Sequence, residues 1–528
     1  MPRATYTLEL ELAYNTWTNI TADWRVDAPL IIERGIEPGE RVAGVGTMTL
    51  ALHNPDGRYT PGHANATPGF EIGIGARLKA SDGTTTSTLF YGRLAEIDPI
   101  PNPIVGARRA LPLRTTIVVE DDMAAVHRAQ VGAFPMILNA APRDLVNRLV
   151  NKSFVAPGAF AYWRLGFATV GKLGQTATLS GDFTGKAFDA GQSVFAWAGD
   201  TWQADQPAAQ ALADTVASEG GMFHIAADGT PVFADRHRRP KHTSVDAALG
   251  DSLAGLQAIR RAAHIANRVE IAVYPRDIAP AVETLWTLGS VIRLLPGLPR
   301  TIIARYVDPN QLAAFVGAQS VVWPQEGEDY AANTQADGNG EDVTAYLTVQ
   351  VILGGNAAQL ILTSRWPVRN EPITITRFTL RGVPLRAYQP VTVIAQDDDS
   401  FLAHGLRPLR IDMPLQDDAR VAGDIASALL ANRKDPHAWL SVTVEATASA
   451  ALLAHALARD VGDRLAVTDS NLALNAAGGF IDHIRHEVQR GGASHRVTWV
   501  ASPADLEAYW IVGEAGFGNL GQATKLGY

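Results

Sequence analysis

The sequence predicts a mainly β, multidomain protein with some α-helix, and three observations predict this class. Apolar and polar residues alternate in many short runs, such as the one through Tyr6, Leu8 and Leu10, and this alternation is typical of half-buried strands. The 47 glycines and 30 prolines divide these runs with turns. The length of 528 residues corresponds to about three or four domains at roughly 150 residues each.

Composition and charge argue against several classes of protein. A net charge of -9 argues against a basic surface for binding nucleic acid. The chain has no cysteine, which excludes disulfides, thiolate metal sites and a cysteine nucleophile and fits assembly in a reducing cytoplasm. The N-terminal residues read as a strand rather than a signal peptide, and no apolar run reaches the ~18 residues that span a bilayer. We therefore expect a soluble protein.

Residues 1–127 are predicted to form an all-β module. Strands are expected over 47–52, 90–97 and 115–119, and the proline-rich segment 98–112 is expected to be a loop at an edge. The tetrapeptide Asn54-Pro55-Asp56-Gly57 has the residue types of a type I turn.

Residues 128–249 are predicted to form a helix and hairpin region with an insertion. Apolar residues recur at helical spacing over 142–150, which predicts a short helix. Residues 153–203 are rich in glycine, threonine and aromatic residues without a helical period, so we expect an inserted β-lobe there.

The stretch 207–236 is the one around which we expect the rest to be organised. Pro207 suits a first helical turn, and Gly220-Gly221 supplies the end of that helix. Asp228-Gly229 predicts a hairpin that would set Ile225 beside Val232. A helix and hairpin of this size bury little alone, so they must pack on the β-rich sequence before and after them.

The remaining chain is predicted to contain a second β module over 250–416 and a C-terminal region over 417–528. Strands are expected in the second module at 269–273, 347–353, 360–363 and 373–380. The C-terminal region is expected to begin with a helix over 417–432 and to continue with a β module, a short helix over 448–459 and a tail rich in glycine and aromatic residues.

No motif predicts a catalytic, cofactor or metal site. His483 and His486 are three residues apart in a strand, which points them to opposite faces and argues against a zinc site. Residues 337–341 carry alternate oxygen donors but lack the distant glutamate of a calcium loop, so a turn is expected. The carboxylate runs 120–122 and 397–399 are interpreted as solvated turns rather than an acid and base pair for glycoside cleavage.

Two further features have a binding interpretation beside a plain structural one. The aromatic residues of 153–203 are most simply core residues, and the alternative is glycan contact through Trp163, Trp197 and Trp202. The basic run 236–242 is most simply a solvated linker, and the alternative is DNA contact.

A series of motifs, taken in order, carries a resemblance to a known family. The N-terminal part of the series is Trp17-Thr18-Asn19-Ile20, Gly46-Thr47-Met48-Thr49-Leu50, Asn54-Pro55-Asp56-Gly57-Arg58-Tyr59-Thr60-Pro61-Gly62 and Phe90-Tyr91-Gly92-Arg93. The series continues through Glu219-Gly220-Gly221, Asp228-Gly229-Thr230, Phe233-Ala234-Asp235-Arg236-His237 and Gly462-Asp463-Arg464, and ends at Trp510, Gly513, Leu520-Gly521 and Tyr528. This order resembles minor tail proteins of long-tailed bacteriophages, a family similar to baseplate hub and tail-tip proteins.

The resemblance implies a structural protein of the virion, assembled in the host cytoplasm. Such proteins form rings, typically homotrimers with two tube-like β-barrel domains per chain, and the modules 1–127 and 250–416 are the candidates for these domains. The implied partners are further copies of the chain, the distal tail protein or tail tube protein, and the tape measure protein. A host surface glycan is a further partner in the alternative where the 153–203 lobe binds sugar. DNA would pass through without specific binding, and no cofactor or enzymatic activity is implied.

Two alternative functions remain open from the sequence. One is a tail-associated hydrolase of glycan or cell wall, and the other is an adhesin that binds sugar through the 153–203 lobe. We also expect part of the excess acidity to face the lumen of the ring, where it would repel DNA as it exits.

Overall fold

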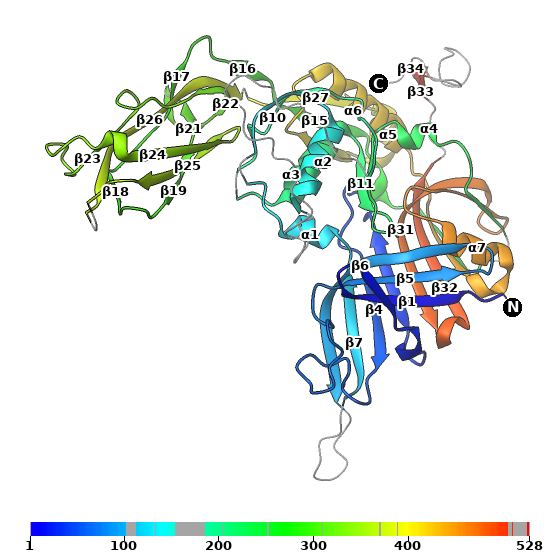
Figure 1. The fold of residues 1–528 in the computed structure, drawn as a ribbon. Helices are drawn as coiled ribbons and strands as arrows, with labels where there is room; N and C mark the ends of the chain where they lie inside the picture. Colours follow the sequence, from blue (N-terminus) through cyan, green and yellow to red (C-terminus); the bar gives the residue numbers. More distant parts are fainter. Residues whose placement is uncertain are drawn as a thin grey trace.

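The computed structural model describes residues 2–101, 112–153, 185–504, 509–510 and 525–526, apart from residues 133, 204, 251–252, 309, 369–370 and 388. The chain is mainly β with few helices and has several packed parts, as the sequence predicts (Figure 1). Among the described helices, none has both the length and the apolar character needed to cross a membrane.

The N-terminal module is built from seven strands joined in the order β3-β4-β7-β6-β5-β1-β2. These strands are β1 (Thr5–Ala13), β2 (Thr16–Asn19), β3 (Leu30–Gly35), β4 (Thr47–His53), β5 (Gly75–Ser81), β6 (Thr86–Pro101) and β7 (Pro112–Glu120). Alternate residues of β1 are buried, namely Tyr6, Leu8 and Leu10, because successive side chains of a strand point to opposite faces. Residues 5–120 thus supply seven strands to one sheet.

The C-terminal strands extend this same sheet. They are β29 (Trp439–Glu445), β30 (Arg464–Asp469), β31 (Leu474–Gln489) and β32 (Ser494–Pro503), with β13 (Ala247–Leu249) and β14 (Gly255–Ile259) added from the middle of the chain. Because β31 pairs with β3, the two modules form one 13-stranded sheet with one continuous core, and Figure 1 shows the blue and the orange strands side by side. Helix α7 (Ala450–Ala458) packs its leucines into that core.

Residues 250–416 do not form one β module, which corrects the expected division. β14 belongs to the large sheet, whereas β15 (Arg268–Val273) pairs with β27 (Val391–Gln396) and β28 (Pro408–Met413) in a small sheet. Helix α6 (Ala419–Arg433) covers one face of this small sheet, and Ile425 packs into their shared core. Strand segments alone could not reveal this division, because alternation does not specify the partner of a strand.

An outer lobe is inserted between β15 and β27 and projects away from the rest (Figure 1). Its strands are β16 (Arg276–Ile278), β17 (Glu283–Thr287), β18 (Ile292–Leu294), β19 (Arg300–Arg305), β20 (Val307–Asp308), β21 (Gln311–Phe315), β22 (Gly317–Val322), β23 (Tyr330–Asn333), β24 (Leu347–Leu353), β25 (Ala357–Ser364) and β26 (Ile373–Ala387). The lobe has its own core, and β26 is its centre because five other strands pair with it.

A central helical region connects the large sheet to the outer lobe. Its elements are α1 (Met123–Arg128), β8 (Ile137–Ala140), α2 (Pro142–Ser153), β9 (Ala187–Phe188), β10 (Phe195–Ala198), α3 (Ala208–Glu219), β11 (Met222–Ile225), β12 (Pro231–Ala234) and α4 (Arg238–Lys241).

The helix and hairpin predicted over 207–236 are confirmed as α3, β11 and β12, and Gly220 ends α3 with φ of 77°. The hairpin register differs by one residue, since Val232 lies opposite His224 rather than Ile225 and the connection is longer than two residues. The chain also has α5 (Asp398–His404), β33 (Tyr509–Trp510) and β34 (Lys525–Leu526).

Candidate functional site

The candidate site is the seam where strands from the two ends of the chain join. β3 and β31 run antiparallel, with Leu30 opposite Val488 and Gly35 opposite His483. Next to the seam, the guanidinium of Arg34 pairs with the carboxylate of Asp460, and the Arg34 side chain is only 3% exposed. Breaking such a pair leaves the buried Arg34 without its partner, so this ion pair favours the observed junction of the two modules.

Residues of one parity on successive strands form a polar face that runs across both modules. Thr47 of β4 lies opposite Glu33 of β3, which lies opposite Arg485 of β31. Arg485 in turn lies opposite Thr498 of β32, which lies opposite Thr443 of β29. On β3, β4, β6, β7, β29, β31 and β32, the acidic residues of this face are Glu33, Glu96, Asp98, Glu120, Glu445 and Glu487, and the basic ones are Arg93, Arg114, Arg485 and Arg496. The face is therefore rich in hydroxyl groups and has more carboxylates than cations.

The opposite side of the seam carries a buried chain of polar side chains. The hydroxyl of Tyr6 lies 2.9 Å from Nδ1 of His495, whose Nε2 lies 3.1 Å from Nδ1 of His486. Burial lowers the pKa of His495 to about 4, although Glu445 acts in the opposite direction. Burial, followed by His495 and Arg34, lowers the pKa of His486 well below its usual value. Both imidazoles are therefore neutral at neutral pH, and their role here is to fill and order the core.

Asp121 is buried beside this region, which corrects the expectation that the run 120–122 is a solvated turn. One carboxylate oxygen accepts a hydrogen bond of 3.0 Å from the backbone N–H of Met123. Burial raises the pKa of Asp121 to about 7 and also raises that of Asp122. A Cβ on Gly46 would lie 2.4 Å from the other carboxylate oxygen, so glycine is required for this close approach.

The second acidic run, 397–399, begins a helix rather than forming a turn, because Asp397 caps α5 by accepting a hydrogen bond from the N–H of Ser400.

The basic run 236–242 is not a solvated linker but connects the central helical region to the large sheet. Arg236 pairs with the fully buried Glu219 at the end of α3, at 3.1 Å. Arg239 pairs with Asp482 of β31 at 2.6 Å and lies over the ring of Phe480. The arginines are thus committed to ion pairs inside the protein, and the DNA-contact reading of this run loses its basis.

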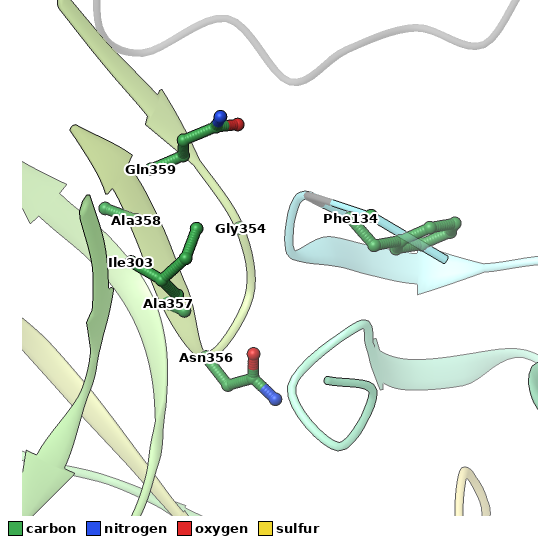
Figure 2. Close-up of a pocket in the computed structure, with 8 residues that line it drawn as sticks. Phe134, Ile303, Gly354, Asn356, Ala357, Ala358 and Gln359 are labelled. Atoms are coloured by element: carbon green, nitrogen blue, oxygen red, sulfur yellow. The ribbon is translucent and has the colours of Figure 1, made fainter. Parts of the chain in front are cut away.

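The outer lobe is attached to the central region through the turn between β24 and β25. The N–H of Gly355 donates to the carbonyl of Phe134 at 2.7 Å, and the side chain of Asn356 donates to the carbonyl of Trp202 at 2.9 Å. A small cavity of about 30 Å³ lies at this contact, with Phe134 on one side and Ile303 on the other (Figure 2). Its volume suits a water molecule and is too small for an organic ligand.

A second hollow, open to solvent and with a volume of about 400 Å³, contains two carboxylates. Asp189 accepts hydrogen bonds from Arg238, and Asp235 accepts them from Gln192 and the N–H of His237. Both carboxylates are thus engaged in holding the loops around them. This arrangement differs from a catalytic pair, whose carboxyl groups face a substrate.

The three tryptophans proposed for glycan contact have different outcomes. Trp202 is 2% exposed, packs edge to face on Phe134 and donates through Nε1 to Asp214 at 3.1 Å. Its burial removes it from any sugar-binding surface. Trp197 is half-buried on β10, and Trp163 lies outside the described residues.

Other residues that the sequence singled out are placed as turn and strand residues. Asp337 accepts from the N–H of Asn339 at 3.0 Å in an exposed loop, as expected for a turn. His486 is buried while His483 is partly exposed, in agreement with the opposite faces predicted for them. Within the part of the chain that the structure describes, no cluster of three or more His, Asp or Glu side chains is arranged to hold a metal.

Neither Arg34 nor Asp460 was predicted from the sequence as a site residue. A signal for Arg34 was available, because it has the same parity as Leu30 and Ile32 and must face inward with them. An arginine at an inward position predicts a buried carboxylate partner. The sequence does not reveal that this partner lies more than 400 residues away.

No protein-family model matches the chain, and no curated protein matches it. Among solved structures, the chain is similar to the 43 kDa tail protein of prophage MuSo2 from Shewanella oneidensis, with 10% identity, a TM-score of 0.46 and coverage of 95% of this chain and 98% of that one. It is similar to a tail protein from Neisseria meningitidis MC58, with 10% identity, a TM-score of 0.45 and coverage of 94% and 97%. It is also similar to a prophage tail protein from Listeria monocytogenes EGD-e, with 7% identity, a TM-score of 0.41 and coverage of 94% and 95%.

Proposed function

We propose that this chain is a structural component of a phage tail tip or baseplate hub, which forms a ring that joins the tail tube to the distal tip and lets DNA pass. The motif order in the sequence first indicates this role. The observation that carries it is the shared sheet, in which two β modules from opposite ends of one chain join edge to edge. We place the two tube-like domains in β1 to β7 and in β13, β14 and β29 to β32.

The polar face of this sheet suits a wall along which DNA slides. Its threonines are small and uncharged, and its excess of carboxylates disfavours contact with phosphate. Ion pairs such as Glu33 with Arg485 hold the basic side chains of the face. In this proposal the polar face lines the lumen, and the helical region and the outer lobe lie outside it.

The partners in this proposal are further copies of the chain, in a homotrimer, with the distal tail or tail tube protein above and the tape measure protein within. Mass photometry and electron microscopy of the purified chain, alone and with these tail proteins, test the proposal. A three-fold ring with six similar β modules around a channel is the expected result. A compact monomer under all these conditions would contradict the proposal.

The proposed role is mechanical and needs no catalysis. Zymography on cell walls separates it from the tail-associated hydrolase, since we expect no clearing by the purified chain. For the adhesin alternative, replacing Trp197 with alanine should leave host adsorption unchanged if the protein acts through ring assembly. Loss of adsorption by otherwise intact particles would support sugar binding instead.

A further inference from the structure

The two β modules repeat one strand order. In the N-terminal module the order is β3-β4-β7-β6-β5, and in the C-terminal module it is β14-β29-β32-β31-β30. The fourth strand of each series, β6 or β31, is 16 residues long and extends beyond the fifth. The modules are thus equivalent strand by strand, although their sequences show no repeat.

Three local details align the modules residue by residue. The register of β6 on β7 shifts between Leu94 and Glu96, and that of β31 on β32 shifts between Ile481 and His483. Gly73 donates to the carbonyl of Leu94 at 2.7 Å, and Gly462 donates to that of Ile481 at 2.8 Å. These two glycines have φ of 91° and 92°. Leu94 therefore corresponds to Ile481, and Gly73 corresponds to Gly462.

The two strands that meet at the seam, β3 and β31, each have a counterpart in the other module, and the corresponding edges of these counterparts are unpaired. β3 pairs with the half of β31 that extends beyond β30. Within the part of the chain that the structure describes, the corresponding half of β6, from Glu96 onward, pairs with β7 on one side only. In the same part of the chain β14, the counterpart of β3, pairs with β29 only. The exposed backbone groups of such edges are templates for another strand.

The side chains around the free edges are those that a second seam would need. At the seam, Val461 is 7% exposed, whereas its counterpart Ile72 is 59% exposed. Ala258 of β14 corresponds to Ile32 of β3, because their partners Leu440 and Met48 take equivalent places in the two modules. Arg260 therefore corresponds to Arg34, and the ion pair of Arg34 with Asp460 corresponds to Arg260 and Glu71. Arg260 and Glu71 are both exposed, and neither makes an ion pair with a described residue. Arg260 is thus exposed beside β14, and Glu71 and Ile72 are exposed beside the free half of β6, on a separate surface of the same chain.

We propose that β14 of one copy pairs antiparallel with the free half of β6 in the next copy, and that Arg260 then reaches Glu71 across the contact. This inference deepens the proposed function, because it names the edges through which the ring closes. The register of the internal seam sets Gln257 opposite Ile100 and Ile259 opposite Asp98. The contact is head to tail, because it joins two different surfaces of the chain. Each copy is therefore related to the next by the same rotation, and a closed ring forms when a whole number of these rotations makes a full turn.

Two residues limit the length of this pairing. Pro99 has no N–H, so one bond of the ladder is missing there. Gly35 approaches β31 with φ of 132°, and its counterpart is Arg261, which cannot approach as closely. The pairing therefore extends over β14 and the residue that follows it, 255–260, and the contacts of Arg260 and Ile72 contribute much of its stability.

Cysteine cross-linking tests the register, because the chain contains no cysteine of its own. The double variant Gln257→Cys with Ile100→Cys should form disulfide-linked chains in non-reducing gels after mild oxidation of the assembled protein. Within one copy these positions are separated by the strands between β14 and β6, so the link joins two copies. The two single variants and the out-of-register pair Gln257→Cys with Glu96→Cys are the controls. A ring without the specific cross-link overturns the proposed edges but leaves the ring function intact, whereas cross-linked open chains support the edges and contradict the ring.

A charge exchange tests the ion pair. Arg260→Glu should reduce assembly at least tenfold at a given protein concentration, and adding Glu71→Arg should restore it. Arg300→Glu, at an exposed arginine of the outer lobe, is the matched control and should assemble normally. All these positions are exposed, and the melting temperature of each variant checks that it folds. Unchanged assembly of the Arg260→Glu variant would overturn the proposed contact.

Discussion

His486 of β31 and His495 of β32 lie in contact in the core of the large sheet, with Nδ1 of the first 3.1 Å from Nε2 of the second. Their surroundings are Tyr6, whose hydroxyl bonds to His495, Glu445, which acts to raise the pKa of His495, and Arg34, which acts to lower that of His486. The pair links the N-terminal strand β1 to β31 and β32 of the C-terminal module.

This pair makes stability depend on pH. The pKa of His495 in the folded protein, about 4, is below its value of 6.5 in the unfolded chain, so its contribution is present above pH 6.5 and is lost as the pH falls toward 4. A full shift of this size corresponds to roughly 3 kcal/mol. Replacing His495 with glutamine should make the protein less stable at pH 7.5, and this difference should shrink as the pH falls. Chemical denaturation at several pH values measures it, with His53→Gln at an exposed position as the control. A difference that stays constant between pH 7.5 and 4.5 would contradict the assignment.

Asp121 should show the opposite dependence. Its folded pKa of about 7 is above the ordinary value of 3.8, so its contribution is full below pH 3.8 and is lost as the pH rises through 7. Asp121→Asn keeps an oxygen for the N–H of Met123 and removes the buried charge. The variant should be more stable than the wild type at pH 8, with little difference near pH 4. A variant that is less stable at pH 8 would show that the carboxylate is favourable in its charged form.

Gly355 should be essential for the attachment of the outer lobe. A Cβ at this position would lie 2.1 Å from the carbonyl oxygen of Gly199, and backbone atoms cannot relieve such a clash cheaply. Gly355→Ala should destabilise the contact by about 1–3 kcal/mol and expose the segment near Phe134 to limited proteolysis. Gly289→Ala in the same lobe has no atom within 4 Å of the new Cβ and is the matched control. Equal proteolysis of the two variants would contradict this account.

The ion pair of Arg276 with Asp200 should be a second anchor of that lobe. The atoms Nε and Oδ2 are 2.9 Å apart, and the two side chains are 1% and 5% exposed. Arg276→Met would leave Asp200 buried without its cation, which typically costs about 3–5 kcal/mol. Calorimetry measures the loss as a lower melting temperature. Arg305→Met, which breaks a half-exposed pair with Asp205 at 3.9 Å, is the control and should change stability by less than about 1 kcal/mol. Similar losses in both variants would show that burial is not the cause.

Much of the local structure could be predicted from the sequence, because local patterns specify it. The alternation through Tyr6, Leu8 and Leu10, the glycine that ends α3 and the apolar stripe of α6 each depend on neighbours within a few residues. The candidate site was largely missed. Trp202 was a candidate for sugar and lies in a core, because an aromatic residue that packs and one that binds have the same local pattern.

The sequence by itself determined many of the strands and helices, which residues of these face inward, and the motif order that resembles a phage tail protein. The tertiary structure alone decided that β3 pairs with β31, that β14 leaves the middle region for the large sheet, and that Arg34 meets Asp460. The physical reason is that the side-chain period of a strand is a local property. The choice of partner depends on the backbone edges and buried charges of segments that are hundreds of residues apart and meet only in the folded chain.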